Sequence, residues 1–391
     1  MQRPQWELAD VINVAGQLFL DRNRHWLTRQ HLKVLRAIQL CRTAALGGHV
    51  DECLHCGYRA TSFNSCRNRH CPKCQSQARK HWLDARQQEL LPTRYVHVVF
   101  TVPRELASLA LQNKKLFYDL LFRASTETLQ TVAADPKHLG AEIGFFSVLH
   151  TWTQKLEYHP HVHCVVPAGG LSFDHTRWVS PRYSFFLPVK VLSRVFRAKF
   201  IAGLKRAFSE HRLGFHGKLK LLGSPQTFSA FLRTLFRQDW VVYCKPPFGG
   251  PEHVLKYLGG YTHRIAISNR RLISLDQDQV AFRWRDSAHG NQQRILTLSV
   301  TEFLRRFLLH VLPHGFVRIR HHGFLANRRR ATMLPLCFAL LAGASVVAPT
   351  ATRAPAPPGS WTCPRCGCPM AVVERLTPAQ LFLRSPPQPT A

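Results

Sequence analysis

Apolar residues recur along the chain with two different periods, and each period predicts a kind of secondary structure. Residues 6–46 carry apolar side chains at helical spacing, which predicts two amphipathic helices. β-Branched and aromatic runs at 95–102 and 145–153 predict two strands, and helical patterns follow at about 105–132 and 189–222. A strand, a helical insert and two adjacent strands predict an α+β domain with a largely antiparallel sheet and helices against one face.

The second half of the chain continues in short elements. Further strands are predicted at 240–244, 271–284 and 294–300, and a helix at 301–312. An Ala/Pro-rich linker precedes a cysteine-containing tail. We therefore divide the chain into a helical and cysteine-containing N-terminal module at 1–90, a main domain at 91–349, and a linker and tail at 350–391.

Three histidines fall within five residues of the segment that follows the strand at 145–153. Successive side chains of a strand point to opposite faces, so His159, His161 and His163 are expected on one face. Val162 and Cys164 then lie on the opposite, core side. Two imidazoles two residues apart can bind one cation, and the alternative is a polar strand face without a role.

Cysteines gather in residues 49–75. Paired Cys-x2-Cys turns can close a tetrahedral zinc shell. This predicts four structural zinc ligands, Cys53, Cys56, Cys71 and Cys74. Cys66, His70 and His49 are left over, so either a second zinc is bound or one of them replaces a ligand. The tail holds Cys363, Cys366 and Cys368, a single knuckle that can bind zinc only with a ligand from elsewhere.

Charge changes the picture of what the chain binds. Lys and Arg number 53 against 22 Asp and Glu, a formal net charge of +31. Such an excess predicts a polyanion, DNA rather than a membrane. Cations alternate with aromatics over residues 314–330, as in nucleic-acid surfaces. Four arginines of this stretch are the expected DNA contacts, Arg318, Arg320, Arg328 and Arg329.

The remaining sequence features concern the cellular location of the protein. Charged residues interrupt the first 20 positions, where a signal peptide needs an apolar run, so we expect no secretion. A cytoplasmic, nucleoid-associated protein with reduced thiols is the expectation that follows. The uncharged stretch at 331–352 contains prolines and a glycine, which predicts a core helix running into a linker and no membrane span.

Tyr257 and Tyr261 are four residues apart and share a face if their segment is helical. Two tyrosines on a helix usually only pack. Beside a cation held by His161 and His163, however, a tyrosine oxygen can attack a phosphate and store the energy of the broken phosphodiester as a tyrosyl phosphate.

His161-Val-His163 followed by Tyr257-x3-Tyr261 resembles the HUH nuclease superfamily. More closely, the segments at 58–75, 159–164, 245–269 and 318–328 resemble, in this order, the rolling-circle transposases of the IS ninety-one family. The similarity extends from about His49 to Arg330, and several separated motifs fall in the expected order.

The resemblance implies an antiparallel-sheet HUH nuclease domain that nicks single-stranded DNA at the element's ends. It implies a 5′-phosphotyrosine intermediate formed by Tyr257 and Tyr261 and strand transfer into target DNA. His161 and His163 become ligands of a catalytic Mg²⁺ or Mn²⁺, and the cysteine module holds Zn²⁺. The superfamily adds a third polar ligand, for which four residues are open candidates: Gln154, Glu157, His97 and His159.

Two other readings compete with this one. A plasmid replication initiator or a relaxase-like nickase would use similar chemistry, but the zinc module and the motif order favour a transposase. A zinc-dependent DNA-binding regulator belongs to a different class, and in it the histidines and tyrosines would be only structural.

Overall fold

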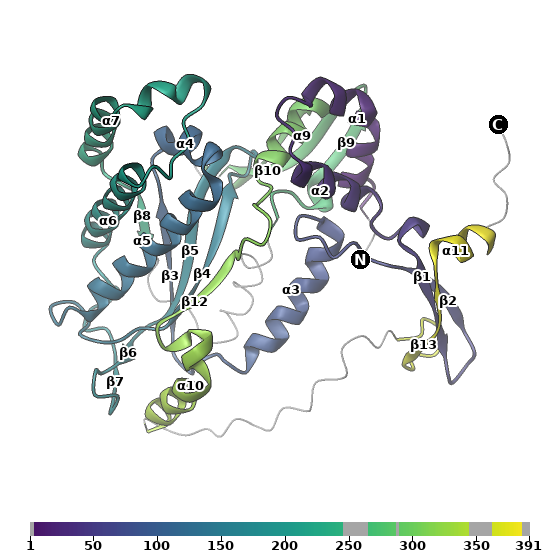
Figure 1. The fold of residues 1–391 in the computed structure, drawn as a ribbon. Coiled ribbons are helices and arrows are strands. Elements are labelled where there is room, and N and C mark those ends of the chain that lie inside the picture. Colours follow the sequence, from purple (N-terminus) through teal and green to yellow (C-terminus); the bar gives the residue numbers. More distant parts are fainter. Residues whose placement is uncertain (1–3, 245–264, 287–288, 344–361, 385–391) are drawn as a thin grey trace. The chain divides into compact units, whose positions relative to one another are not determined.

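The computed structural model describes residues 4–244, 265–286, 289–343 and 362–384 (Figure 1). They form two compact units. The first takes in the described residues of Met1–His81, Ile265–Val311 and Ala348–Ala391, and the second those of Trp82–Arg264 and Leu312–Val347. This differs from the division expected at residues 90 and 349, because both 265–311 and the tail join the N-terminal module.

The second unit is organised around a five-stranded sheet with the strand order β12-β4-β5-β3-β8. All four neighbouring pairs are antiparallel, which confirms the α+β class with an antiparallel sheet. The strands are β3 (Tyr95–Thr101), β4 (Phe145–Trp152), β5 (Tyr158–Pro167), β8 (Val242–Cys244) and β12 (Ile319–His322).

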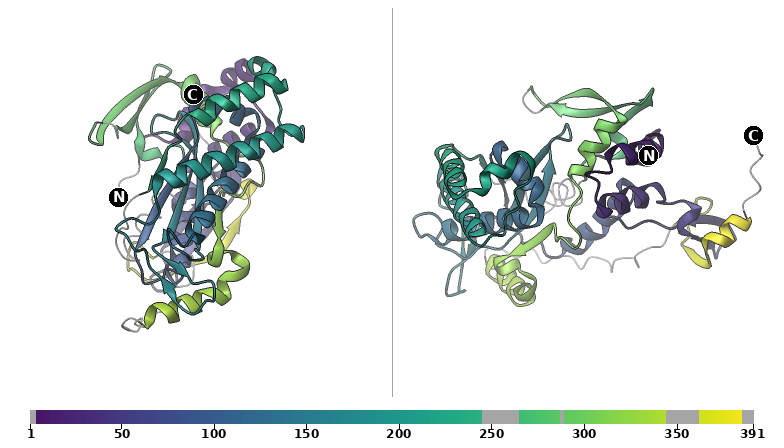
Figure 2. Two further views of the ribbon diagram at one scale, coloured as in Figure 1. Left: turned by 90° about the vertical axis from the view of Figure 1, so that its left-hand side faces the viewer. Right: turned by 45° about the horizontal axis from the view of Figure 1, so that its top comes forward.

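Helices cover one face of this sheet. Helix α5 (Lys114–Ala134) and helix α6 (Val189–Ser209) lie side by side over it, with α4 (Ala107–Gln112) and α7 (Pro225–Arg237) in the same unit (Figure 1 and Figure 2). The core between sheet and helices is apolar and aromatic. The rings of Phe100 and Phe196 are 5.0 Å apart between centroids.

Helix α6 is shorter than the helix predicted over 189–222. The chain leaves the helix at His211, whose φ is 54°. The N–H of Arg212 then reaches back to the carbonyl of Ala207 at 2.9 Å. This is a common way to end a helix, and it needs one residue in the left-handed region.

The opposite face of the sheet carries a smaller apolar cluster. Tyr95, Phe146, Val148 and Val165 are buried there, and Trp82 packs on Phe146 with ring centroids 5.7 Å apart. Trp82 belongs to helix α3 (Pro72–Gln87). Helix α10 (Asn327–Ala342) packs on the short hairpin β6 (Gly170–Leu171) and β7 (Trp178–Val179).

The first unit begins with the two helices expected from the sequence, α1 (Leu8–Asn23) and α2 (Arg29–Gln39). Its sheet β11-β10-β9 packs on helix α9 (Val300–Leu309). The run predicted at 271–284 is a hairpin of β9 (Leu272–Asp276) and β10 (Gln279–Asp286), because Gln277 and Asp278 turn the chain with φ values of 43° and 61°. Strand β11 is Gln292–Ser299.

A second small sheet in this unit joins the two ends of the chain. Its order is β13-β1-β2, with β1 (Gly48–Cys53), β2 (Arg59–Phe63) and β13 (Met370–Leu376). Strand β13 runs antiparallel to β1, from Gly48 opposite Leu376 to Cys53 opposite Met370. Helix α11 (Pro378–Arg384) follows β13. No described helix meets the length and apolarity that a membrane span requires.

Candidate metal centres

Three histidines on adjacent strands form the first candidate centre. His161 and His163 lie on β5, and His150 lies on β4 directly opposite His161. One ring nitrogen from each lies within 4.8 Å of the others. Val162 and Cys164 are fully buried in the core on the opposite face, which confirms the alternation expected from the sequence.

The β4–β5 connection holds His150 in this register. The N–H of Thr153 donates to the carbonyl of Glu157 at 3.0 Å, so the chain turns back within five residues. The ladder shifts between His150 and Trp152. Trp152 stacks on His150, with ring centroids 4.8 Å apart. The imidazole of His150 is therefore fixed both by the strand pairing and by an aromatic neighbour.

Hydrogen bonds orient the two histidines of β5. Nδ1 of His161 lies 2.7 Å from the carbonyl oxygen of His159, so Nδ1 carries the proton and Nε2 keeps its lone pair. Nδ1 of His163 lies 2.8 Å from Nε2 of His97 on β3. When that Nδ1 donates, His163 also presents Nε2. This is the usual arrangement of metal-binding imidazoles, and the residues fit a divalent cation.

The geometry adds a residue that the sequence analysis did not single out as a ligand. His150 was not among the four candidates for a third ligand, yet it lies with His161 and His163. His97 instead lies behind His163, and Glu157 is exposed beside the turn. Strand alternation was the available signal. His150 lies in the strand predicted at 145–153 and shares a face with Val148, which is paired with His163.

The expected nucleophiles, Tyr257 and Tyr261, lie outside the described residues. Tyr158 precedes the three histidines on β5, but its environment is structural. Its Oη lies 2.8 Å from Oη of Tyr118, and burial raises its pKa well above the ordinary value. A buried phenol of this kind is a poor nucleophile near neutral pH.

The four cysteines predicted to share one zinc belong to two separate clusters. Cys71 and Cys74 meet Cys41 and Cys66, whereas Cys53 and Cys56 meet cysteines of the tail. In the first cluster, Sγ of Cys74 lies 3.6 Å from Sγ of Cys41 and 3.5 Å from Sγ of Cys66. These separations approach the ~3.8 Å edge of a tetrahedron with ~2.3 Å zinc–sulfur bonds.

This first cluster corrects the ligand set expected from the sequence. Cys66, which was left over, belongs to the cluster with Cys71 and Cys74. Cys41 was not predicted as a ligand, because it also completes the apolar stripe of the second predicted helix. His49 lies 3.5 Å from Asp51, and neither His49 nor His70 belongs to a cluster of metal-binding residues in the part of the chain that the structure describes.

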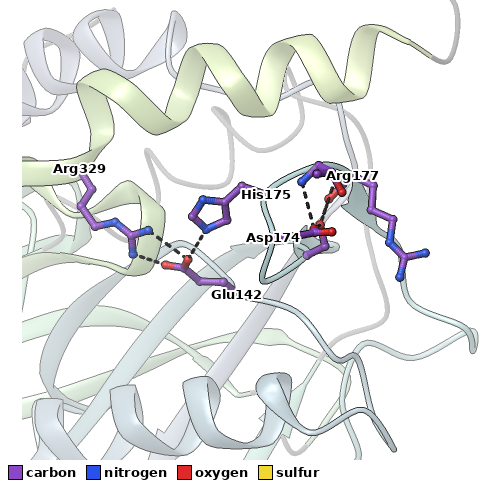
Figure 3. A network of polar contacts seen from close by, with 7 residues as sticks. Glu142, Asp174, His175, Arg177 and Arg329 are labelled. Carbon is purple, nitrogen blue, oxygen red and sulfur yellow. Dashed lines mark hydrogen bonds and ion pairs between the residues drawn. The ribbon is translucent and has the colours of Figure 1, made fainter.

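Two of the four arginines expected to contact DNA form ion pairs within the protein. Arg329 on α10 forms two hydrogen bonds with Glu142, which also pairs with His175 at 3.1 Å (Figure 3). Burial alone would raise the pKa of Glu142, but these partners outweigh it and lower that pKa. Figure 3 also shows Asp174 and Arg177 in the neighbouring β6–β7 turn.

The other three arginines differ in exposure. Arg320 pairs with Asp119 at 2.5 Å and covers the ring of Phe122 at 4.2 Å. Arg318 is buried. Arg328 is exposed, so among the four it is the side chain best placed to meet a partner.

Comparison with known proteins gives family matches to two separate stretches of the chain. A profile described as "Putative transposase" matches residues 144–332, and one described as "Transposase zinc-binding domain" matches residues 11–102. "Putative transposase y4qJ" of Sinorhizobium fredii (strain NBRC 101917 / NGR234) is 55% identical over 355 residues, which are 91% of this chain and 89% of that protein.

A more distant relative and one solved structure are also similar. "Transposase for insertion sequence element IS801" of Pseudomonas savastanoi pv. phaseolicola is 29% identical over 313 residues, or 77% of this chain and 72% of that protein. The metal-free structure of conjugative relaxase TrwC in complex with oriT DNA matches 43% of this chain and 74% of its own, with 12% identity and a TM-score of 0.25.

Proposed function

Because the chain belongs to the IS ninety-one family of insertion-sequence transposases, we propose that it nicks single-stranded DNA at the element's ends and transfers the strand through a phosphotyrosine intermediate. The observation that carries this proposal is the histidine centre. His150, His161 and His163 converge on one face of the five-stranded sheet.

These three residues would hold the catalytic cation. A bound divalent ion would draw electron density from a phosphate oxygen and so favour attack at phosphorus. The all-imidazole set fits a transition-metal ion such as Mn²⁺ better than Mg²⁺, which prefers oxygen ligands. The chain's own contribution is orientation, since the carbonyl of His159 and the ring of His97 fix which nitrogen the two β5 histidines present.

The proposed nucleophiles are Tyr257 and Tyr261, assigned from the family resemblance. The phenol oxygen of one tyrosine forms a bond to phosphorus while the bond from phosphorus to the 3′ oxygen breaks. The phenol proton passes to solvent, and the leaving 3′ oxygen takes one up. The product is a 5′-phosphotyrosine and a free 3′ hydroxyl, so no external energy source is needed to rejoin the strand.

The proposal is tested by looking for a covalent adduct between the protein and DNA. Full-length protein is incubated with end-labelled single-stranded DNA of the element's termini and with Mn²⁺ or Mg²⁺, and the products are separated on a denaturing gel. We expect an adduct that disappears only when Tyr257 and Tyr261 are both changed to Phe. Absence of an adduct with every metal would support a DNA-binding regulator instead.

Histidine variants connect the adduct to the described site. His161→Ala and His163→Ala should each abolish nicking and leave DNA binding largely intact, because the excess of basic side chains supplies most of the affinity. His216→Ala, an exposed histidine of the same unit, is the matched control. Addition of target DNA separates a transposase, which transfers the bound strand, from a nickase that only rejoins it.

A further inference from the structure

The tail of the chain brings two cysteines to the N-terminal module. Sγ of Cys366 lies 3.4 Å from Sγ of Cys53 and 3.6 Å from Sγ of Cys56. Sγ of Cys363 lies 3.5 Å from Sγ of Cys56. All four sulfurs lie within 4.8 Å of one another, close to the ~3.8 Å edge of a zinc tetrathiolate.

The two halves of this cluster have the same backbone structure. The N–H of Gly57 donates to the carbonyl of Cys53, and that of Gly367 to the carbonyl of Cys363, both at 2.8 Å. Gly57 and Gly367 have φ values of 68° and 75°, a conformation that glycine adopts without strain. Two turns of one type, separated by most of the chain, thus face each other.

Backbone N–H groups point at the sulfurs. Cys53 accepts hydrogen bonds from the N–H groups of His55 and Cys56. Cys363 accepts the equivalent pair from within its own turn. Such donors favour the thiolate, which is the form that binds zinc. The backbone of both turns therefore favours zinc binding by their cysteines.

The apolar core of the tail is small. Within residues 362–384 the buried apolar side chains are Cys363, Leu376 and Leu381. The pairing of β13 with β1 adds backbone hydrogen bonds but little apolar burial. A segment with so small a core usually depends on a metal or another covalent constraint.

From these observations we propose that Cys53, Cys56, Cys363 and Cys366 bind a second zinc ion, which fastens the C-terminal tail to the N-terminal module. Cys363 and Cys366 lie outside both matched family regions, 11–102 and 144–332. The proposal assigns two zinc ions to each chain, one held by residues of the N-terminal region alone and one shared between the two ends. It does not depend on the nuclease chemistry.

Zinc content is the first test. The full-length chain is purified with His161→Ala and His163→Ala, so that the histidine centre adds no zinc to the count. It should contain two zinc ions by mass spectrometry, and the same protein with Cys363→Ser/Cys366→Ser should contain one. Cys71→Ser/Cys74→Ser should also lose one, from the other cluster. Cys368→Ser is the matched control and should retain two, because Cys368 groups with His55 and Cys366 but not with Cys53, Cys56 or Cys363. One zinc in the protein with all its cysteines, or two in the tail variant, would overturn the proposal.

Controlled cleavage provides a second test that leaves every ligand in place. A protease site is introduced at residues 350–359, and the cut protein is passed over a sizing column. The tail fragment should elute with the rest of the chain in zinc-containing buffer and separate from it after chelation. In Cys363→Ser/Cys366→Ser it should separate without a chelator. A fragment that stays bound in that variant would contradict the role of zinc in holding it.

Discussion

Nε2 of His97 lies 2.8 Å from Nδ1 of His163, and the planes of the two rings are 3° apart. Both side chains are buried on neighbouring strands of one sheet, so the contact is held by the β3–β5 register, in which Val99 lies opposite His163. His97 thereby determines which nitrogen His163 offers to a cation.

Removing this support should weaken the centre without removing a ligand. His97→Ala is expected to lower the Mn²⁺ affinity of the histidine centre about 10- to 100-fold, as loss of such a supporting contact does in other metal sites. Excess Mn²⁺ should restore nicking. His97→Gln should lose less Mn²⁺ affinity, because its amide oxygen can still accept a hydrogen bond from Nδ1–H of His163. A Mn²⁺ titration followed by electron paramagnetic resonance measures the affinity. An unchanged Mn²⁺ affinity in His97→Ala would contradict the supporting role of His97.

The third ligand can be tested by comparing two nearby histidines. His150→Ala should lose Mn²⁺ binding at this centre and nicking together, whereas His159→Ala should retain both. The ring of His159 is 5.4 Å from that of His161 between centroids, but it is not part of the three-histidine group. If His159→Ala lost the metal and His150→Ala kept it, His159 and not His150 would be the third ligand.

Adjacent arginines on α10 should separate DNA binding from stability. Arg328→Ala is expected to weaken single-stranded DNA binding and reduce the slope of log affinity against log salt by about 1, with no change in unfolding. Arg329→Ala should leave that slope intact and lower the free energy of unfolding by about 1 to 2 kcal/mol, because it removes a partly buried partner of Glu142. Salt titrations and urea unfolding measure the two effects, and a reversed pattern would refute the distinction.

A partly buried histidine of β12, His322, should make the second unit sensitive to mild acid. Burial, with the nearby charge of Arg320, lowers the pKa of His322 to about 4. The unfolded chain takes up this proton near pH ~6.5, so the free energy of unfolding should fall as the pH drops from ~6.5 to about 4. Allowing for partial exposure, we expect a loss of about 1 kcal/mol between pH ~7.5 and ~5.

The matching variant is His322→Gln, whose amide can replace the contact of His322 with Oγ of Ser147 at 2.8 Å. Urea unfolding followed by tryptophan fluorescence should give a shallower pH dependence for this variant than for the wild type. His216→Gln, on the surface, should behave as the wild type does. Equal slopes in all three proteins would show that His322 does not titrate as described.

Local periodicity predicted the parts of the structure that depend on neighbouring residues. The face shared by His161 and His163 follows from strand alternation, and the antiparallel sheet follows from the order of strands and helices. The partners of Cys53 and Cys56 could not be found in this way, because Cys366 is 313 residues from Cys53 and only the pairing of β13 with β1 brings them together.

Residues with two plausible roles were the other source of differences. Cys41 fits the apolar stripe of a helix as well as a metal cluster, and its sulfur contacts decide between them. Arg320 and Arg329 fit a DNA-binding pattern, but Asp119 and Glu142 lie far from them in sequence and pair with them in the fold. Composition shows the excess of positive charge but not which cations are already neutralised.

The pairing of β13 with β1 also has a consequence for how the chain is made. During translation, β1 and β2 leave the ribosome hundreds of residues before their third strand exists, since 313 residues separate Cys53 from Cys366. Until then one edge of β1 is open, and an open edge can pair with another chain. Any copy of the gene cut short before residue 370 produces a protein that keeps this edge, because β13 (Met370–Leu376) is the strand that covers it.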